Sequence, residues 1–373
     1  MNIKVGISIS LSGNYSVQGI ESFEGLKLWV KHINNRRGIF VEDSNKPHLV
    51  ELMHYDDQST VELCRANTEK LILKDKVDIL LGPYSSSLAL AACEVAQEHD
   101  MTLWNHGGST DEIEERNFSC VINAITPASH YSYGIIDCVR KADPQAKRVA
   151  IFSASNSGFS SRIANAAKAY SEQKGFDVRE FKFISGSAEF KIYLAKLVGY
   201  NADLILSVAR AEDDIAIAKW LSSNNINTKA RAFVAASIKL FKDELGNNAQ
   251  GALSSSQWER GVQIKPDIGP TPREFYTSFL KEYGKAPDYV AAQGYNIGLV
   301  LEKCIECAKT LEDKALRQTA KSLEFDTFYG KFKTDSKGNQ IGHKMVVVQW
   351  QNSQKVIVHP QAIAQAQIVY PLI

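Results

Sequence analysis

Short apolar runs alternate along the chain with longer segments in which apolar residues recur at helical spacing. In the first third, the apolar runs predict strands at 3–10, 48–55, 77–82, 101–105 and 119–124. The helical periodicity predicts helices near 17–36, 60–75 and 87–98. Strands that alternate with helices are joined by right-handed crossovers and form parallel sheets covered on both faces. This part of the chain is therefore expected to form one α/β lobe.

The alternation restarts near residue 148 and predicts a second lobe of the same kind. Its strands are expected at 148–155, 177–184, 202–209 and 230–236. Its helices are expected near 159–174, 188–199 and 211–223, with a short one after Ser237. Two successive sets predict two doubly wound, Rossmann-like lobes in the α/β class.

The last third breaks the alternation. After a strand-like run at 251–258 comes a loop with three prolines, and helices are then expected near 272–284, 289–309 and 312–322. The segment 343–360 reads as an antiparallel hairpin that turns at Asn352–Gln354. Elements this far downstream must complete lobes begun earlier, so the chain is expected to cross between the lobes more than once.

Composition excludes several classes of function. The chain has 373 residues, and its 43 Lys plus Arg balance 42 Asp plus Glu to a net charge of +1. The basic residues are scattered, which argues against nucleic acid as a partner. No apolar run approaches the ~20 residues that a membrane-spanning helix needs. Six cysteines are too few for a disulfide scaffold in a chain of this length.

The start of the chain leaves the location open between two possibilities. Strand-like sequence begins directly after Met1, without a recognisable leader. The protein is expected to be periplasmic or extracellular if Met1 was added to a mature chain, and cytoplasmic if Met1 is the native start.

Motifs for catalysis or for metal and cofactor binding are not found. The sequence has no G-x-S-x-G elbow, no Walker A motif, no G-x-G-x-x-G after a strand and no H-E-x-x-H. The eight histidines show no metal-ligand spacing, and His106 is expected to be a wall residue rather than a base. We therefore expect a protein that is not an enzyme and that uses no metal or cofactor.

Polar residues follow two neighbouring strands at the edge where parallel sheets bind ligands. Ser85, Ser86 and Ser87 come after the strand at 77–82, and Gly107–Ser109 come after the next strand. Hydroxyls and free N–H groups at a helix start bind anions, so a carboxylate held by Ser86 and Gly107–Ser109 is chemically sensible. The alternative is that these serines only cap helices.

The chain resembles a known family over nearly its whole length. The resemblance is carried in order by "IKVGISISLSGNYSVQGIESFEGLKLWVKHINNRRGI", "YDDQSTVELC", "DILLGPYSSSLALA", "NHGGSTDEI", "FDTFYGKFKTDSKGN" and "MVVVQWQN". These segments resemble type I periplasmic binding proteins of the leucine/isoleucine/valine-binding family, which are the substrate-binding components of ABC transporters.

The resemblance implies two lobes joined by three crossovers that close over a ligand by a hinge motion. Matched to that pattern, lobe 1 on the carboxylate-binding side would hold residues 1–122 and 251–328. Lobe 2 on the closing side would hold residues 123–250 and 329–373.

The resemblance also implies a set of ligand-binding positions. Ser86, Gly107 and Ser109 fall on positions that take the ligand's carboxylate and share in its amino group. Gln18 falls on a wall position of the first loop, and Phe159 on an aromatic that closes down from the second lobe. The remaining candidates in these loops are Tyr84, Ser85 and Gly108, although Ser85 and Ser87 are better suited to capping.

Two positions depart from the branched-chain members of the family. Arg210 stands where they place a tyrosine, and Ala236–Ser237 stand where they place a glutamate for the ligand's ammonium. An arginine in the site would favour a second carboxylate or another anion. Glu212 or Asp213 could replace the missing acid, or could begin a solvated helix.

The resemblance implies a solute-binding protein that presents its ligand to a membrane permease. The ligand is expected to be a small carboxylate, either an amino acid or an organic acid without an amino group, such as an aromatic acid. The alternative is a ligand-sensing regulator or sensor domain of the same fold, of the cytosolic amide-sensing type.

Overall fold

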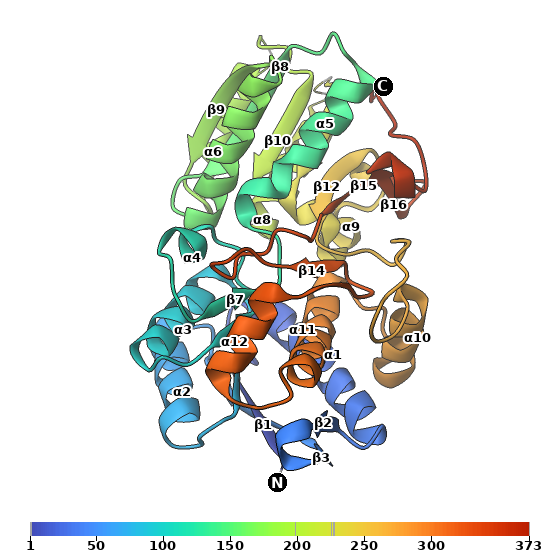
Figure 1. Ribbon diagram of the computed structural model, residues 1–373. Coiled ribbons are helices and arrows are strands. Elements are labelled where there is room, and N and C mark those ends of the chain that lie inside the picture. The colour runs from blue at the N-terminus through green and yellow to red at the C-terminus, as the bar shows by residue number, and fades with distance from the viewer. Residues whose placement is uncertain (1, 198, 225, 227, 373) are drawn as a thin grey trace. The chain divides into compact units, whose positions relative to one another are not determined.

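The chain folds into two compact units, each built from two stretches of sequence. The computed structural model describes residues 2–197, 199–224, 226 and 228–372 (Figure 1). Unit 1 comprises Met1–Thr126 and Gln263–Lys344, and unit 2 comprises Pro127–Val262 and Met345–Ile373.

Unit 1 is built on a parallel sheet with the order β4-β1-β5-β6-β7. Its strands are β1 (Ile3–Ile9), β4 (Val50–Asp56), β5 (Ile79–Leu81), β6 (Leu103–Asn105) and β7 (Val121–Asn123). Two small antiparallel ribbons complete the unit: β2 (Ile39–Val41) with β3 (Lys46–His48), and β13 (Glu324–Asp326) with β14 (Lys331–Lys333).

The helices of unit 1 cover this sheet. They are α1 (Ser16–Asn35), α2 (Val61–Leu73), α3 (Ser86–Glu98), α4 (Glu112–Glu115), α10 (Pro272–Tyr283), α11 (Tyr289–Ala308) and α12 (Asp313–Ser322). Helices α2 and α3 share one apolar core with the sheet, in which Cys64, Leu88 and Leu103 are fully buried. Helix α1 packs on β1 and β4, and also on α11.

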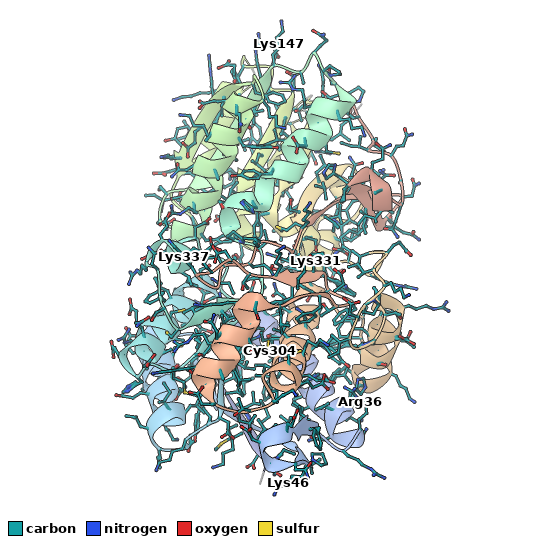
Figure 2. The ribbon with its side chains drawn as sticks, viewed as in Figure 1. Arg36, Lys46, Lys147, Cys304, Lys331 and Lys337 are labelled. Carbon is teal, nitrogen blue, oxygen red and sulfur yellow. The ribbon has the colours of Figure 1, made fainter. Side chains whose placement is uncertain are left out.

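Helices α1 and α11 approach each other closely, although they come from opposite ends of the sequence. In Figure 1 they lie side by side, α1 in blue and α11 in orange. A Cβ atom at Gly294 would lie 1.9 Å from the Ser22 carbonyl oxygen, so only glycine permits this contact. Where α1 ends, the Arg36 guanidinium, labelled in Figure 2, lies 3.1 Å from the Glu302 carboxylate of α11. Both helices therefore run in the same sense.

Unit 2 is built on a larger, mixed sheet with the order β16-β15-β12-β11-β10-β8-β9. Its parallel strands are β8 (Arg148–Ala154), β9 (Asp177–Phe183), β10 (Leu204–Val208), β11 (Ala230–Phe233) and β12 (Ala252–Ser256). The hairpin of β15 (Val346–Gln351) and β16 (Gln354–His359) joins β12 in antiparallel pairing.

Helices cover both faces of this sheet. They are α5 (Tyr133–Ala142), α6 (Gly158–Gln173), α7 (Phe190–Leu197), α8 (Ala211–Ser223) and α9 (Lys239–Leu245). Consecutive strand residues alternate between the two cores: Ile151 packs in one with α5 and α6, and Phe152 in the other with α7 and α8. Among the described residues, no helix is both long enough and apolar enough to cross a membrane.

The α/β class and the two doubly wound sheets predicted from the sequence are confirmed, and the predicted strands and main helices are present. Helices α4 and α5 and the two small ribbons were not predicted.

The predicted lobe boundaries need correction. Residues 251–262 belong to unit 2, because Leu253 pairs with β11 and with β15 in its sheet. Residues 329–344 belong to unit 1, because β14 pairs with β13 and the Asn123 N–H donates to the Gly338 carbonyl. The latter contact also places residues 123–126 in unit 1.

Gly294→Ala is expected to destabilise the protein by about 3 kcal/mol, because the added methyl group must push the backbones of α1 and α11 apart. Chemical denaturation followed by circular dichroism measures this loss. Gly199→Ala is the matched control, because a Cβ there meets no atom within 4 Å. Equal stability of the two variants would contradict the close contact.

Candidate functional site

The carboxyl ends of β1, β5 and β6 lie side by side in the sheet of unit 1. Ile7 is in register with Leu81, and Leu81 with Trp104. Because the three strands are parallel, the segments 10–15, 82–85 and 106–111 that follow them meet at one edge of the sheet. We call this edge, together with the helix starts beside it, the carboxyl edge of unit 1.

The three serines at this edge differ in their hydrogen bonds: Ser85 caps α3, whereas the hydroxyl of Ser86 is unused in the described part of the chain. Ser85 is the N-cap of α3, and its Oγ accepts a hydrogen bond from the Leu88 N–H at 3.4 Å. Ser87 is exposed, and its Oγ lies 3.4 Å from that of Ser85. Ser86 is half-buried, and its hydroxyl makes no hydrogen bond with the described part of the chain. That Ser86 binds a ligand stays a prediction.

Ser85 holds a strained backbone conformation at the junction of β5 and α3. Its φ of 88° and ψ of 147° lie in a region that is almost reserved for glycine. Such a conformation costs about 1–3 kcal/mol and persists only where surrounding structure enforces it. Here the preceding Gly82 and Pro83 and the following Leu88 are buried, while Tyr84 is half-buried. The serine segment therefore has a fixed shape.

The loop after β6 presses against this segment. A Cβ at Gly107 would lie 2.5 Å from the Pro83 carbonyl oxygen, and one at Gly108 would lie 2.1 Å from Ala89 Cβ. Ser109 is only 8% exposed. Within the described residues, neither its hydroxyl nor the N–H groups of Gly107 and Ser109 have a hydrogen-bond acceptor. Two glycines thus bring a group of unused donors next to the start of α3.

Two aspartates fix the loop after β1. The Asp56 carboxylate accepts hydrogen bonds from the Leu11 N–H at 2.9 Å and the Ser12 hydroxyl at 2.7 Å. Burial raises the pKa of Asp56, but these bonds and one from Gln58 outweigh it and lower the pKa below its usual value. Asp57 is fully buried and accepts from Ser10 Oγ at 2.5 Å, while burial raises its pKa.

Gln18 lies in the first turn of α1, directly after this loop, and is half-buried. Its position at the carboxyl edge agrees with a place in the wall of a site, and that role stays a prediction.

Lys285 pairs with two carboxylates of α1, and a third carboxyl, that of Asp288, lies beside one of them. Its Nζ lies 3.3 Å from Glu21 and 2.8 Å from Glu24. Asp288 is the N-cap of α11 and accepts from the Val290 N–H at 2.8 Å. Burial and the neighbouring Asp288 carboxyl raise the pKa of Glu21 to about 8, although Lys285 acts in the opposite direction.

In unit 2 the predicted residues follow the carboxyl ends of β8, β10 and β11, which are neighbours in its sheet. Phe159 is the second residue of α6, is half-buried, and contacts Tyr131 edge to face at 5.6 Å between ring centroids. Arg210 is the N-cap residue of α8, and its exposed side chain makes no hydrogen bond or ion pair with the described residues.

The Ser237 hydroxyl and the Asp213 carboxylate already make hydrogen bonds within unit 2. Ser237 is 5% exposed, and its Oγ donates to the Val234 carbonyl at 3.3 Å. Asp213 accepts from the Ser185 hydroxyl and from the Gly186 N–H at 2.9 Å. Glu212 is exposed. Asp213 is therefore engaged in shaping the loop after β9, rather than available to replace a missing acid.

Asp214, the next residue, has a structural position of its own. It is fully buried and accepts from Ser207 Oγ at 2.6 Å and from the Ala235 N–H at 2.9 Å. Burial raises its pKa well above the usual value. Asp214 thereby joins β10 to the turn that follows β11.

The structure gathers the predicted residues into two groups, one on each unit. Gln18, Tyr84, Ser85, Ser86, Gly107, Gly108 and Ser109 lie at the carboxyl edge of unit 1, and Phe159, Arg210 and Ser237 at that of unit 2. Sequence reasoning missed the roles of Asp56, Asp57 and Asn105. The acidic pair at the end of β4, Asp56 and Asp57, was the signal that could have shown this, because polar residues at strand ends often bond neighbouring loops.

Side chains that could bind a metal ion are not clustered in the described part of the chain. No three His, Cys, Asp or Glu side chains there are grouped so as to hold a metal ion. All six cysteines are free thiols; five are buried and Cys307 is exposed. Burial raises the pKa of Cys64 to about 12 and that of Cys120 to about 11, which keeps both protonated.

The chain is similar to known proteins over most of its length. A family model described as periplasmic binding protein matches residues 2–355. The Leu/Ile/Val-binding protein homolog 7 of Brucella melitensis is 23% identical over 394 aligned residues, which cover 99% of this chain and 94% of the relative.

Solved structures show the same fold at low identity. One is the branched-chain amino acid transporter substrate binding protein of Streptococcus pneumoniae in complex with isoleucine, with a TM-score of 0.79, 19% identity and 100% of both chains covered. Another is a solute binding protein of an ABC transporter from R. palustris in complex with benzoate, with a TM-score of 0.77, 17% identity and coverage of 100% of this chain and 98% of the other.

Glu21→Gln is expected to raise stability at pH 8–9 relative to the wild type and to change it least near pH 5. The unfolded carboxyl titrates near pH 4.5 and the folded one near pH 8. The stability that Glu21 contributes is therefore complete below pH 4.5 and is lost as pH rises through 8. Above that, the ionised carboxyl is buried and faces Asp288, and Lys285 opposes this destabilisation.

Urea unfolding between pH 5 and pH 9 measures this difference. The control is Glu62→Gln, at an exposed carboxyl in the first turn of α2. A stability difference between Glu21→Gln and the wild type that does not vary with pH would argue against the raised pKa.

Proposed function

Because the chain belongs to the periplasmic binding protein family, we propose that it is the solute-binding component of an ABC importer and binds a small carboxylate-bearing molecule. Its curated relatives carry the name Leu/Ile/Val-binding protein, and structures of the same fold hold isoleucine or benzoate. Family members of this kind bind solutes and are not enzymes, so the proposal includes no covalent step.

The observation that carries the proposal is the set of unused donors at the carboxyl edge of unit 1. The hydroxyls of Ser86 and Ser109 and the N–H groups of Gly107 and Ser109 have no acceptor among the residues described. Helix α3 starts beside them, and the N-terminus of a helix favours negative charge. A carboxylate supplies the acceptors that these donors lack, and its two oxygens can take several hydrogen bonds at once.

Unit 2 is proposed to close over the bound molecule. The chain passes between the units after Thr126, Val262 and Lys344, and short connections of this kind act as hinges in two-domain binding proteins. On closure Phe159 would cover apolar surface of the ligand, while Gln18 would form part of the wall on unit 1.

The chemistry of unit 2 favours an acid without an ammonium group over an amino acid. A buried ammonium needs a carboxylate or several acceptors. At the ends of β10 and β11, Asp213 and Asp214 are already hydrogen-bonded, while the guanidinium of Arg210 is unpaired within the described residues. Aromatic acids and dicarboxylates fit this balance of charge, and amino acids remain the second class to test.

The proposed place of action is outside the cytoplasmic membrane, in the periplasm or at the cell exterior, with a membrane permease as the protein partner. The description of the matching family supports the first part of this statement. The names of the structural relatives, which are ABC transporter substrate-binding proteins, support the second.

The wild-type protein is expected to bind at least one of benzoate, 3,4-dihydroxybenzoate, isoleucine and leucine, and not the matching amide, in which the carboxylate is neutralised. Ser86→Ala is expected to weaken that binding by about 1–2 kcal/mol, roughly 5- to 30-fold in Kd, because one charge-assisted hydrogen bond is lost. Thermal shift identifies the binder, and calorimetry measures Kd.

Ser87→Ala is the matched control, since Ser87 is the exposed neighbour on the same turn of α3. Equal affinities of Ser86→Ala and Ser87→Ala would indicate that Ser85–Ser87 only cap α3. Tight binding of the amide would reject the carboxylate.

Arg210→Ala is expected to weaken binding of aromatic and dicarboxylic acids more than binding of leucine, because these acids carry a net negative charge, whereas leucine is a zwitterion whose ammonium the guanidinium repels. Calorimetry on the same panel of ligands gives the ratio of Kd values between variant and wild type. An equal ratio for every ligand would exclude Arg210 as a determinant of selectivity.

A further inference from the structure

We propose that Asn105, supported by His106, is a positioning residue that holds Gly107–Ser109 in the shape of a carboxylate receptor. This inference rests on the proposed function, since it concerns the same loop. Neither side chain is proposed to touch the ligand. Both side chains instead fix the backbone of Gly107–Ser109, which carries the unused donors.

Asn105 binds both polar groups of one peptide residue. Its side chain is fully buried at the end of β6. Its Oδ1 accepts from the Gly108 N–H at 2.9 Å, and its Nδ2 donates to the Gly108 carbonyl at 2.7 Å. The orientation of the amide follows from these partners, because an N–H can only donate and a carbonyl can only accept. One side chain thus closes a tight loop over Gly107.

The two hydrogen bonds between Asn105 and Gly108, which we call the clamp, determine which donors of the loop stay unused. With both Gly108 groups occupied, the N–H groups of Gly107 and Ser109 and the Ser109 hydroxyl are left without acceptors in the described part of the chain. Donors held in place before binding lose little conformational entropy when a ligand arrives. An unclamped loop with two adjacent glycines would have to pay that entropy on binding.

A second amide anchors the clamp to the next strand. The remaining Nδ2 hydrogen of Asn105 is donated to Asn123 Oδ1 on β7 at 2.7 Å. The backbone N–H of Asn123 in turn donates to the Gly338 carbonyl at 2.9 Å, which ties β7 to the turn at 335–339. Asn105 therefore uses all of its donors, and a fully satisfied buried network fixes a single local conformation.

His106 anchors the other side of the loop to α1. It is 1% exposed, and its Nε2 lies 3.0 Å from the Ser22 hydroxyl. Burial lowers the pKa of His106 to about 4, so the ring is neutral at physiological pH and Nε2 can accept from Ser22. The loop is thus connected both to β7 and to α1, which both belong to unit 1.

The experiment compares Asn105→Leu with Thr102→Val. Leucine keeps the branched shape of the side chain, but it can neither accept from the Gly108 N–H nor donate to the Gly108 carbonyl and to Asn123. Thr102 begins the same segment at the opposite end of β6, where its Oγ1 donates to Asp313 at 2.8 Å. Thr102→Val therefore removes a partly buried hydrogen bond of unit 1 without touching the loop.

Two readouts are taken on the full chain. Hydrogen exchange of the Gly107–Ser109 amides reports on the loop itself, and calorimetry with benzoate and isoleucine as probes reports on binding. Asn105→Leu is expected to speed exchange of the Gly108 amide at least 10-fold, because that N–H loses its acceptor, and to weaken binding of the probe at least 10-fold. Thr102→Val is expected to lower Tm while leaving both readouts at wild-type values.

Ser22→Ala is the milder second variant, which serves if Asn105→Leu does not fold. It removes only the hydroxyl that bonds His106, and a two- to threefold change in both readouts is expected. If amide hydrogen exchange of Gly107–Ser109 is unchanged in the variants, or changes equally in Thr102→Val, the proposed role of Asn105 is overturned. Faster exchange without any change in binding overturns the receptor role of the loop, but not the clamp. If the wild type binds neither probe, calorimetry is repeated with 3,4-dihydroxybenzoate and leucine, and failure of all four acids to bind overturns the proposed carboxylate site.

Discussion

The close contact between α1 and α11 is the constraint on which the rest of unit 1 depends. It joins the first stretch of that unit to the second, across the residues that build unit 2. Gly25 and Gly294 allow the two backbones to touch, since a Cβ at either would lie 2.0 Å or less from a carbonyl oxygen of the other helix. Because the helices run in the same sense, both begin at the carboxyl edge, where the proposed site lies.

The chemistry of that edge follows from how backbone groups are distributed. Parallel strands end together, helices start with unsatisfied N–H groups, and buried side chains occupy some of these groups but not others. Asp56 and Asp57 take up the donors of the first loop, and Asn105 takes up those of Gly108. The donors on Ser86, Gly107 and Ser109 have no acceptor among the described residues. In the proposed site, recognition of the ligand relies on these donors.

The sequence predicted the architecture well, because strand and helix periodicities are local. The distinction between the cap Ser85 and the open Ser86 also has a local origin in the start of α3. The lobe boundaries were misplaced because the pairing of residues 252–256 with β15 joins segments about a hundred residues apart. The role of Asn105 was missed because its partners depend on the shape of the loop, which no motif records. Ser237 was chosen by position, whereas its hydroxyl bonds the adjacent Val234 carbonyl.

The discontinuity of unit 1 has a consequence for how the protein is made. Helix α1 leaves the ribosome long before α11, and at ~5–20 residues per second the delay is roughly 10–50 s. During that time the face of α1 that includes Leu26 and Trp29 has no α11 to cover it, although both side chains are fully buried in the finished protein. The core of unit 1 therefore cannot be completed until residues 289–308 have been synthesised, after the whole first stretch of unit 2.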